Sequence, residues 1–267
     1  MYQTFTDWAA HHFAEREMNS LWRWIEDYLK EHEEKEHFSI LKEIMVRLAS
    51  GEPIQYITNR AYFFDMQLFV NENVLIPRPE TEELVYFVAD KLKHTIAPSI
   101  LDVGTGSGCI ILGIAGQIPD ARCYGCDVDD ATIEVARANA EKYEKDVEFF
   151  KADFTESQNF DSLPQMDVIV SNPPYILESE KGVMSPSTVF EPYHALFSRE
   201  GAMWAYEAIL ELAMKKLKRG GLMAFELSEY HVEEVLSTIE SKQFEFEQTE
   251  VRKDLQDKPR VLMARKK

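Results

Sequence analysis

The chain has 267 residues, enough for one α/β domain of ordinary size and a small accessory unit. Hydrophobic residues make up 45% of it, so the composition excludes a globally disordered protein. The formal net charge is -18. So acidic a protein repels a phosphate backbone, and no long basic block is present, so direct nucleic-acid binding is not expected.

No membrane association is expected either. No apolar stretch approaches the roughly 20 residues that a membrane-spanning helix needs. The opening residues lack both a basic, apolar leader and an Arg-rich transit pattern. We therefore expect a cytoplasmic protein. The three cysteines fit this compartment, because an odd number argues against a disulfide scaffold.

Two of the cysteines, Cys123 and Cys126, have the C-x-x-C spacing of some zinc and redox sites. No second pair follows them, and Cys109 falls in a different predicted element. We interpret all three as small buried side chains and predict no metal site.

The first part of the chain is predicted to be a helical domain over residues 1–53. Apolar residues recur at helical spacing within residues 21–29 and again within residues 40–48. Gly51 stands where a helix is expected to end, and Pro53 follows it.

Residues 54–76 are predicted to form a β-hairpin linker, because residues 62–70 are rich in aromatic and apolar side chains typical of short strands. Pro77 and Pro79 then stiffen a loop, and the sequence Glu80-Thr81-Glu82 opens the next helix. We expect the large domain to cover residues 77–267.

Strands and helices alternate from residue 99 onward, which predicts a doubly wound parallel sheet. The expected strands cover residues 100–103, 122–126, 147–151, 167–170 and 222–227. Near the end of the sequence, residues 244–251 and 260–264 have strand patterns with no helix between them. They predict an antiparallel hairpin at one edge of the sheet.

A glycine-rich loop follows the first of these strands and precedes an apolar helix. It consists of Gly104, Thr105, Gly106, Ser107 and Gly108. Glycines let a backbone turn sharply and approach a ligand closely, and Asp127 ends the next strand, where an acid can bind ribose hydroxyls. Together these features predict a nucleotide-type ligand rather than an ordinary loop.

The loop reads G-x-G-x-G rather than the G-x-G-x-x-G of dinucleotide folds, and Asp102 precedes it. It resembles the first motif of S-adenosylmethionine enzymes. By the same resemblance Phe154, which follows Asp153 at the end of the third strand, flanks the adenine. Its alternative role is core packing.

The fourth strand ends in Asn172-Pro173-Pro174-Tyr175. A residue before proline is confined to extended conformations, and proline has no N–H, so this segment offers a rigid row of acceptors. The Asn172 side-chain oxygen and a backbone carbonyl can each accept one hydrogen of an –NH2 group, while Tyr175 stacks on its plane.

Such a site suits an amide or an aromatic amine, whose nitrogen lone pair is delocalised and poorly nucleophilic. Fixing both hydrogens aims the lone pair at a methyl donor and stabilises the charge that develops on nitrogen. Asn172, Pro173 and Tyr175 are therefore the predicted catalytic residues. The alternative role of the segment is a β-turn.

With these motifs the sequence resembles the HemK/PrmC family, the protein-(glutamine-N5) methyltransferases, over nearly its whole length. The matching segments are residues 51–56, 74–82, 102–108 and 172–175, followed by Glu191-Pro192, Ala195-Leu196 and Gly220-Gly221. The sequence departs from the family pattern at Asn59, Asp65, Ser228 and His231.

The resemblance implies a class I, Rossmann-like S-adenosylmethionine methyltransferase domain behind a helical N-terminal domain. It implies transfer of a methyl group to the glutamine of the Gly-Gly-Gln loop of class-1 peptide chain release factors, with S-adenosylhomocysteine as the product. We expect a monomer whose residues 1–53 bind this partner. Arg78 and Thr81 are expected to close the site.

By the same resemblance, two sets of site residues follow. The expected cofactor residues are Gly104, Thr105, Gly106, Ser107, Gly108, Asp127, Phe154 and Asn172. The expected substrate residues are Asn172, Pro173, Pro174 and Tyr175. Two alternatives stay open: an N6-adenine or N4-cytosine nucleic-acid methyltransferase, and a non-catalytic S-adenosylmethionine sensor.

Overall fold

The computed structural model describes residues 1–184, 186–241 and 244–267, and these residues divide into two compact units. Unit 1 comprises Met1–Arg60 and η4 (Pro186–Phe190). Unit 2 comprises Ala61–Met184 and Glu191–Lys267. The domain boundaries expected after residues 53 and 76 stay predictions, because compactness alone does not show which part folds independently.

Unit 1 is built from short helices, as the apolar spacing predicted. They are α1 (Tyr2–Ala9), α2 (Glu15–Leu29), the 3-10 helix η1 (Glu34–Glu36), α3 (His37–Ala49) and α4 (Ile54–Ile57). Phe5, Ile25 and Leu41 are fully buried and join these helices in one apolar core. Gly51 has a φ of 88°, the left-handed conformation of a residue that follows a helix end.

Asn59 replaces a glycine of the family pattern and also takes a left-handed conformation, with a φ of 51°. Asparagine tolerates this conformation better than most residues with a side chain, because its short amide can bond locally. The departure at Asn59 therefore preserves the turn that leads into the hairpin of β1 (Arg60–Phe63) and β2 (Met66–Phe69).

Unit 2 contains a seven-stranded sheet in the order β5-β4-β3-β6-β7-β9-β8. Its strands are β3 (Ser99–Val103), β4 (Arg122–Asp127), β5 (Val147–Lys151), β6 (Met166–Ser171), β7 (Leu217–Glu226), β8 (Phe246–Lys253) and β9 (Pro259–Lys266). The first five are parallel, while β9 runs antiparallel to β7 and β8. The doubly wound sheet and its edge hairpin are confirmed.

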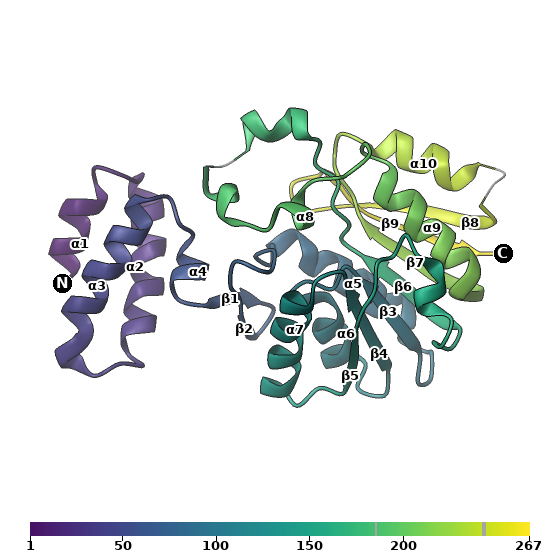
Figure 1. The fold of residues 1–267 in the computed structure, drawn as a ribbon, viewed down its shortest axis with the longest axis horizontal. Helices are drawn as coiled ribbons and strands as arrows, with labels where there is room; N and C mark the ends of the chain where they lie inside the picture. Colours follow the sequence, from purple (N-terminus) through teal and green to yellow (C-terminus); the bar gives the residue numbers. More distant parts are fainter. Residues whose placement is uncertain (185, 242–243) are drawn as a thin grey trace. The chain divides into compact units, whose positions relative to one another are not determined.

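Helices cover both faces of this sheet (Figure 1). On one face lie α5 (Pro79–Leu92), α6 (Cys109–Gln117) and α7 (Asp130–Lys142), and on the other α9 (Trp204–Lys216) and α10 (Val232–Glu240). Side chains of a strand alternate between faces, so Ile100 joins the first layer and Leu101 the second. Both faces are buried, which explains the apolar strands.

Short elements connect the layers. They are the 3-10 helices η2 (Ser157–Phe160) and η3 (Glu178–Val183) and the single-turn helix α8 (Tyr193–Leu196). All three cysteines are buried and unpaired, which confirms their interpretation as core residues. Within the described part of the chain, no helix is long and apolar enough to cross a membrane.

The order of the sheet fixes where a ligand can bind. From β3 the chain first builds β4 and β5 on one side, and then crosses back to place β6 on the other. Ligands of such sheets bind at the carboxyl ends of the strands beside this reversal. The glycine-rich loop follows β3 and Asn172 follows β6, so both lie at that point.

Candidate active site

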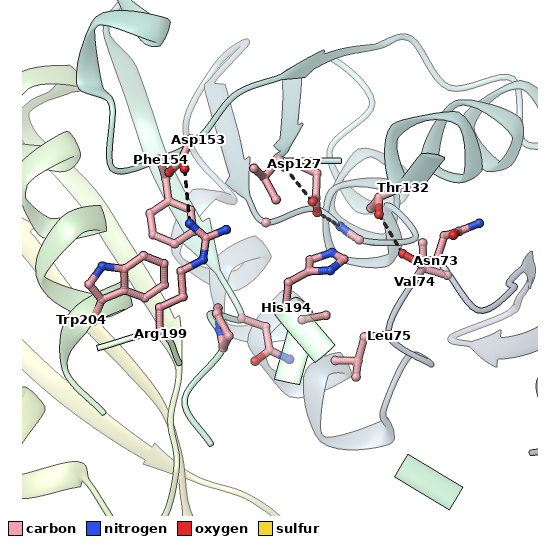
Figure 2. Close-up of a pocket in the computed structure, with 16 residues that line it drawn as sticks. Asn73, Val74, Leu75, Asp127, Thr132, Asp153, Phe154, His194, Arg199 and Trp204 are labelled. Carbon is pink, nitrogen blue, oxygen red and sulfur yellow. Dashed lines mark hydrogen bonds and ion pairs between the residues drawn. The ribbon is translucent and has the colours of Figure 1, made fainter. Parts of the chain in front are cut away.

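A pocket in unit 2 lies where the sheet order reverses (Figure 2). The residues predicted from the sequence that line it are Gly104, Gly106, Asp127, Phe154, Asn172 and Pro174. The remaining lining residues are Asn73, Val74, Leu75, Val128, Thr132, Asp153, His194, Ala195, Arg199 and Trp204. The structure thus brings the glycine-rich loop, the carboxylate of Asp127 and the acceptor row into one cavity.

Gly104 and Gly106 form the floor of the pocket. Their φ angles are 70° and 56°, and a Cβ atom on either would meet nothing within 4 Å. The backbone therefore faces open space, so that a ligand can approach it closely.

The other members of the glycine-rich loop shape it from behind and do not line the pocket in the described structure. Thr105 donates its hydroxyl to Asp102 Oδ2 at 2.7 Å. Ser107 is 2% exposed. A Cβ on Gly108 would stand 3.4 Å from Leu112, in the packing beneath α6. A direct role for Thr105, Ser107 or Gly108 in cofactor binding stays a prediction.

The carboxylate of Asp127 is held in place by backbone amides. Its Oδ2 accepts from Gly106 at 3.1 Å, and its Oδ1 accepts from Val128 at 2.8 Å. Each carboxylate oxygen can accept a further hydrogen bond, so the group can bind two neighbouring hydroxyls. Burial raises the pKa of Asp127, although these amides and the nearby His194 oppose the rise. Figure 2 shows His194 on the pocket side of Asp127.

Aromatic side chains build one wall of the pocket. The rings of Phe154 and Trp204 lie 5.4 Å apart between centroids. The guanidinium of Arg199 lies 5.5 Å from the Trp204 ring and 3.7 Å from the Asp153 carboxylate (Figure 2). The sequence reasoning missed Arg199 and Trp204, since no motif spacing marks them.

The opposite wall comes from Asn73, Val74 and Leu75, in the segment just before Pro77 and Pro79. Thr132 donates its hydroxyl to the Asn73 carbonyl at 2.7 Å and so ties this segment to α7. The sequence did not mark Asn73, Val74, Leu75 or Thr132 as site residues. Val74 and Leu75 could have been found, because they begin a segment that carries the family resemblance, and Ala195 lies in another such segment.

The acceptor row is supported from below by a buried carboxylate. Thr81 donates to Glu226 Oε2 at 2.6 Å, Tyr175 donates to Glu226 Oε1 at 3.4 Å, and Asn172 Nδ2 lies 3.5 Å from Thr81 Oγ1. Glu226 is 2% exposed, and burial raises its pKa. Pro173 and Tyr175 stand behind Asn172 and Pro174 rather than on the pocket surface.

The groups that line the pocket can be compared with the parts of an adenosine-like ligand. The open floor over Gly104 and Gly106 admits a ligand close to the backbone, and Asp127 can accept two neighbouring hydroxyls. The Phe154–Trp204 wall offers a face for a flat base. These groups fit a nucleoside with a polar tail.

Comparison with known proteins agrees with this geometry. The family model described as Methyltransferase small domain matches residues 85–206. The chain is 35% identical over 224 residues to the release factor glutamine methyltransferase of Flavobacterium psychrophilum, a match that covers 82% of this chain and 77% of that protein. It is 36% identical over 226 residues to the protein of the same name from Bacteroides thetaiotaomicron, covering 84% and 80%.

Among solved structures, the hMettl16 catalytic domain superposes with a TM-score of 0.60 over 76% of each chain. The sequence identity is 17%, so this likeness shows a shared methyltransferase fold and nothing finer.

Proposed function

Because the chain belongs to the family of release factor glutamine methyltransferases, and is therefore a methyltransferase, we propose that its substrate is the glutamine of the Gly-Gly-Gln loop of a class-1 peptide chain release factor. The enzyme takes a methyl group from S-adenosylmethionine, attaches it to the N5 nitrogen of that side chain, and releases S-adenosylhomocysteine. The observation that carries the proposal is that Asn172 and Pro174 line the same pocket as Gly106 and Asp127.

In this proposal the pocket holds S-adenosylmethionine by groups of known chemistry. Asp127 binds the ribose hydroxyls, Gly104 and Gly106 let the ligand lie against the backbone, and Phe154 with Trp204 covers the base. When bound, the cofactor supplies an electrophilic methyl group on a positively charged sulfur. The residues of the pocket fix the angle at which the substrate nitrogen approaches this methyl group.

The acceptor row positions the glutamine amide. Asn172 Oδ1 accepts one N–H of the amide, and a backbone carbonyl of the Pro173-Pro174 pair accepts the other. The two bonds fix the nitrogen plane, so that its lone pair faces the methyl group, and they stabilise the positive charge that develops on the nitrogen. No general base is needed beforehand, because the nitrogen becomes acidic as it is methylated and then loses its extra proton to solvent water.

A nucleic-acid amine is the second candidate acceptor. The hMettl16 structure contains an RNA hairpin, and the same acceptor row suits N6 of adenine or N4 of cytosine. The net charge of -18 speaks against it, because a nucleic-acid enzyme must hold phosphates. A non-catalytic sensor has no use for the acceptor row, which favours an enzyme.

A mass-spectrometric experiment tests the proposed reaction. The purified protein is incubated with S-adenosylmethionine and a release factor, and the added methyl group is located on the peptides. We expect it on the Gly-Gly-Gln glutamine, and none on a release factor in which this glutamine is replaced by alanine. Methylation of duplex DNA or RNA, with the release factor left unmodified, would refute the glutamine substrate and support the nucleic-acid amine.

We further propose that residues 1–53 bind the release factor, since they lie outside the unit that contains the pocket. A chain that lacks them should still bind S-adenosylmethionine and should no longer methylate the intact release factor. If this shortened chain modifies the whole factor at the normal rate, the helices have another role.

A further inference from the structure

Two buried side chains behind the pocket form a chain of hydrogen bonds that ends on Asn172. Thr81, in the first turn of α5, donates to Glu226 Oε2 at 2.6 Å, and Asn172 Nδ2 lies 3.5 Å from the same Thr81 oxygen. Thr81 and Glu226 are each 2% exposed, so water does not compete for these bonds. Neither residue lines the pocket.

The direction of each bond in this chain follows from the hydrogens available. The Thr81 hydroxyl has a single hydrogen, and it donates this hydrogen to Glu226 Oε2. Once Thr81 has given its hydrogen to Glu226, its oxygen can only accept from Asn172. Asn172 must therefore turn its –NH2 toward Thr81, and its Oδ1 then points the other way.

Other neighbours also favour Glu226 as a hydrogen-bond acceptor. Tyr175 donates to its second oxygen at 3.4 Å. The positive charge of Arg260 opposes the rise in the pKa of Glu226 that burial causes, although Glu80 adds to that rise. The Glu226 backbone carbonyl accepts from Tyr206 at 3.1 Å, which fixes this end of β7.

We propose that Thr81 and Glu226 are positioning residues that set the direction of the Asn172 amide, so that its oxygen faces the methyl acceptor. The inference rests on the proposed function, because only a substrate that carries N–H groups needs this oxygen as a hydrogen-bond partner. Without the Thr81 hydroxyl, the amide can turn over and present its –NH2 group to the N–H groups of the substrate. Two donors then face each other, and the substrate nitrogen loses its alignment.

The first measurement compares two substitutions at Thr81. Thr81→Val removes the hydroxyl and keeps the size, whereas Thr81→Ser keeps the hydroxyl and is the matched control. In single-turnover methylation of a release factor, we expect Thr81→Val to lower the rate of the chemical step about 10-fold or more. The affinities for the release factor and for S-adenosylmethionine should stay within about 2-fold, and Thr81→Ser should retain most of the rate.

A double-mutant cycle separates orientation from general damage. Asn172→Asp has an oxygen on both sides, so it has no orientation to lose. We expect Thr81→Val to lower the rate about 10-fold or more with Asn172 present, and less than about 3-fold in the Asn172→Asp background. Equal losses in both backgrounds would mean that Thr81 is merely structural, and would overturn the proposal.

The side-chain amide of Asn172 can also be observed directly by NMR in the protein without ligands. Its pair of ¹H–¹⁵N signals is identified by its absence in Asn172→Ala. We expect one slowly exchanging pair in the natural protein and in Thr81→Ser. Rapid exchange or two sets of signals in the natural protein would refute the proposal, even if Thr81→Val did not fold.

These measurements keep the two proposals apart. If the natural protein leaves the release factor unmethylated, the proposed function fails, while the NMR signals still decide whether the amide is oriented. If the factor is methylated and the cycle is additive, only the positioning role fails.

Discussion

Arg78 donates a hydrogen bond of 2.6 Å to the carboxylate of Glu191, and thereby joins two segments that are far apart in the sequence. The side chain of Glu191 is 2% exposed, and its other oxygen accepts the Ile76 amide at 3.3 Å. Leu75 and His194, which stand close to these residues in sequence, both line the pocket. The pair therefore fastens two parts of the pocket wall together.

Arg78→Ala should destabilise the protein, because it leaves the buried Glu191 carboxylate without its positive partner. We expect the free energy of unfolding, measured by chemical denaturation, to fall by about 1–3 kcal/mol. Arg78→Lys keeps a positive charge and should therefore lose less stability than Arg78→Ala. The control is Lys93→Ala, which removes the exposed partner of Asp90 and should leave the stability almost unchanged, because water and salt screen an exposed ion pair. Equal effects at both positions would contradict a special role for Arg78.

Trp204→Ala should weaken S-adenosylmethionine binding, because it removes one ring of the wall formed with Phe154. We expect the dissociation constant, measured by calorimetry, to rise about 5-fold or more, and Trp204→Phe to recover most of the affinity. Asp127→Ala, which removes the carboxylate proposed to bind the ribose hydroxyls, serves as a reference and should raise the constant about 10-fold or more. Normal affinity in Trp204→Ala would place the base elsewhere.

Asn172→Ala should lower the single-turnover rate of methylation about 100-fold or more, because one substrate N–H loses its acceptor and the nitrogen loses its alignment. Asn172→Asp keeps an oxygen of nearly the same shape and should retain more activity than Asn172→Ala. Rates are compared at saturating cofactor and release factor. An Asp variant no better than the Ala variant would show that Asn172 does not act as an acceptor.

The stability of the protein should depend on pH through Asp102. Burial raises the pKa of this carboxyl to about 7, against the lowering effect of the Thr105 hydrogen bond. Between the ordinary aspartate range and that value, the folded protein holds a proton that the unfolded chain has released. The free energy of unfolding therefore falls as the pH rises through this window.

Asp102→Asn cannot titrate, so its melting temperature should rise relative to that of the natural protein between about pH 4 and about pH 7. Scanning fluorimetry without cofactor gives the comparison. A constant difference across this range would show that another group titrates.

Much of the fold was predictable, because strand and helix patterns and turn residues agree in unit 2. The strand expected over residues 222–227 is the clearest difference, since β7 already begins at Leu217. Lys218, Arg219 and two glycines carry no strand pattern, but the strand extends because Leu217 pairs with Met166 of β6. This tertiary pairing overrides the local sequence.

The site was predictable only in part, for a physical reason. Gly104 and Asn172 directly follow strands, and Asp127 is the last residue of one, so the sheet places them without further information. Arg199 and Trp204 depend on how the chain returns after residue 190. The return is fixed by hydrogen bonds of Ile176 with Leu196 and Ser198, at 3.2 and 2.9 Å, which no local pattern reveals.

The buried cysteines can report how often the structure around the pocket opens. Cys126 directly precedes Asp127 and Cys109 directly follows the glycine-rich loop, and both thiols are buried in the cores that flank the sheet. Burial raises the pKa of both, and an alkylating reagent reacts with the thiolate. Modification therefore has to wait until the strand ends around the pocket separate. A ligand that holds these ends together should slow alkylation by the factor by which it reduces the opened population.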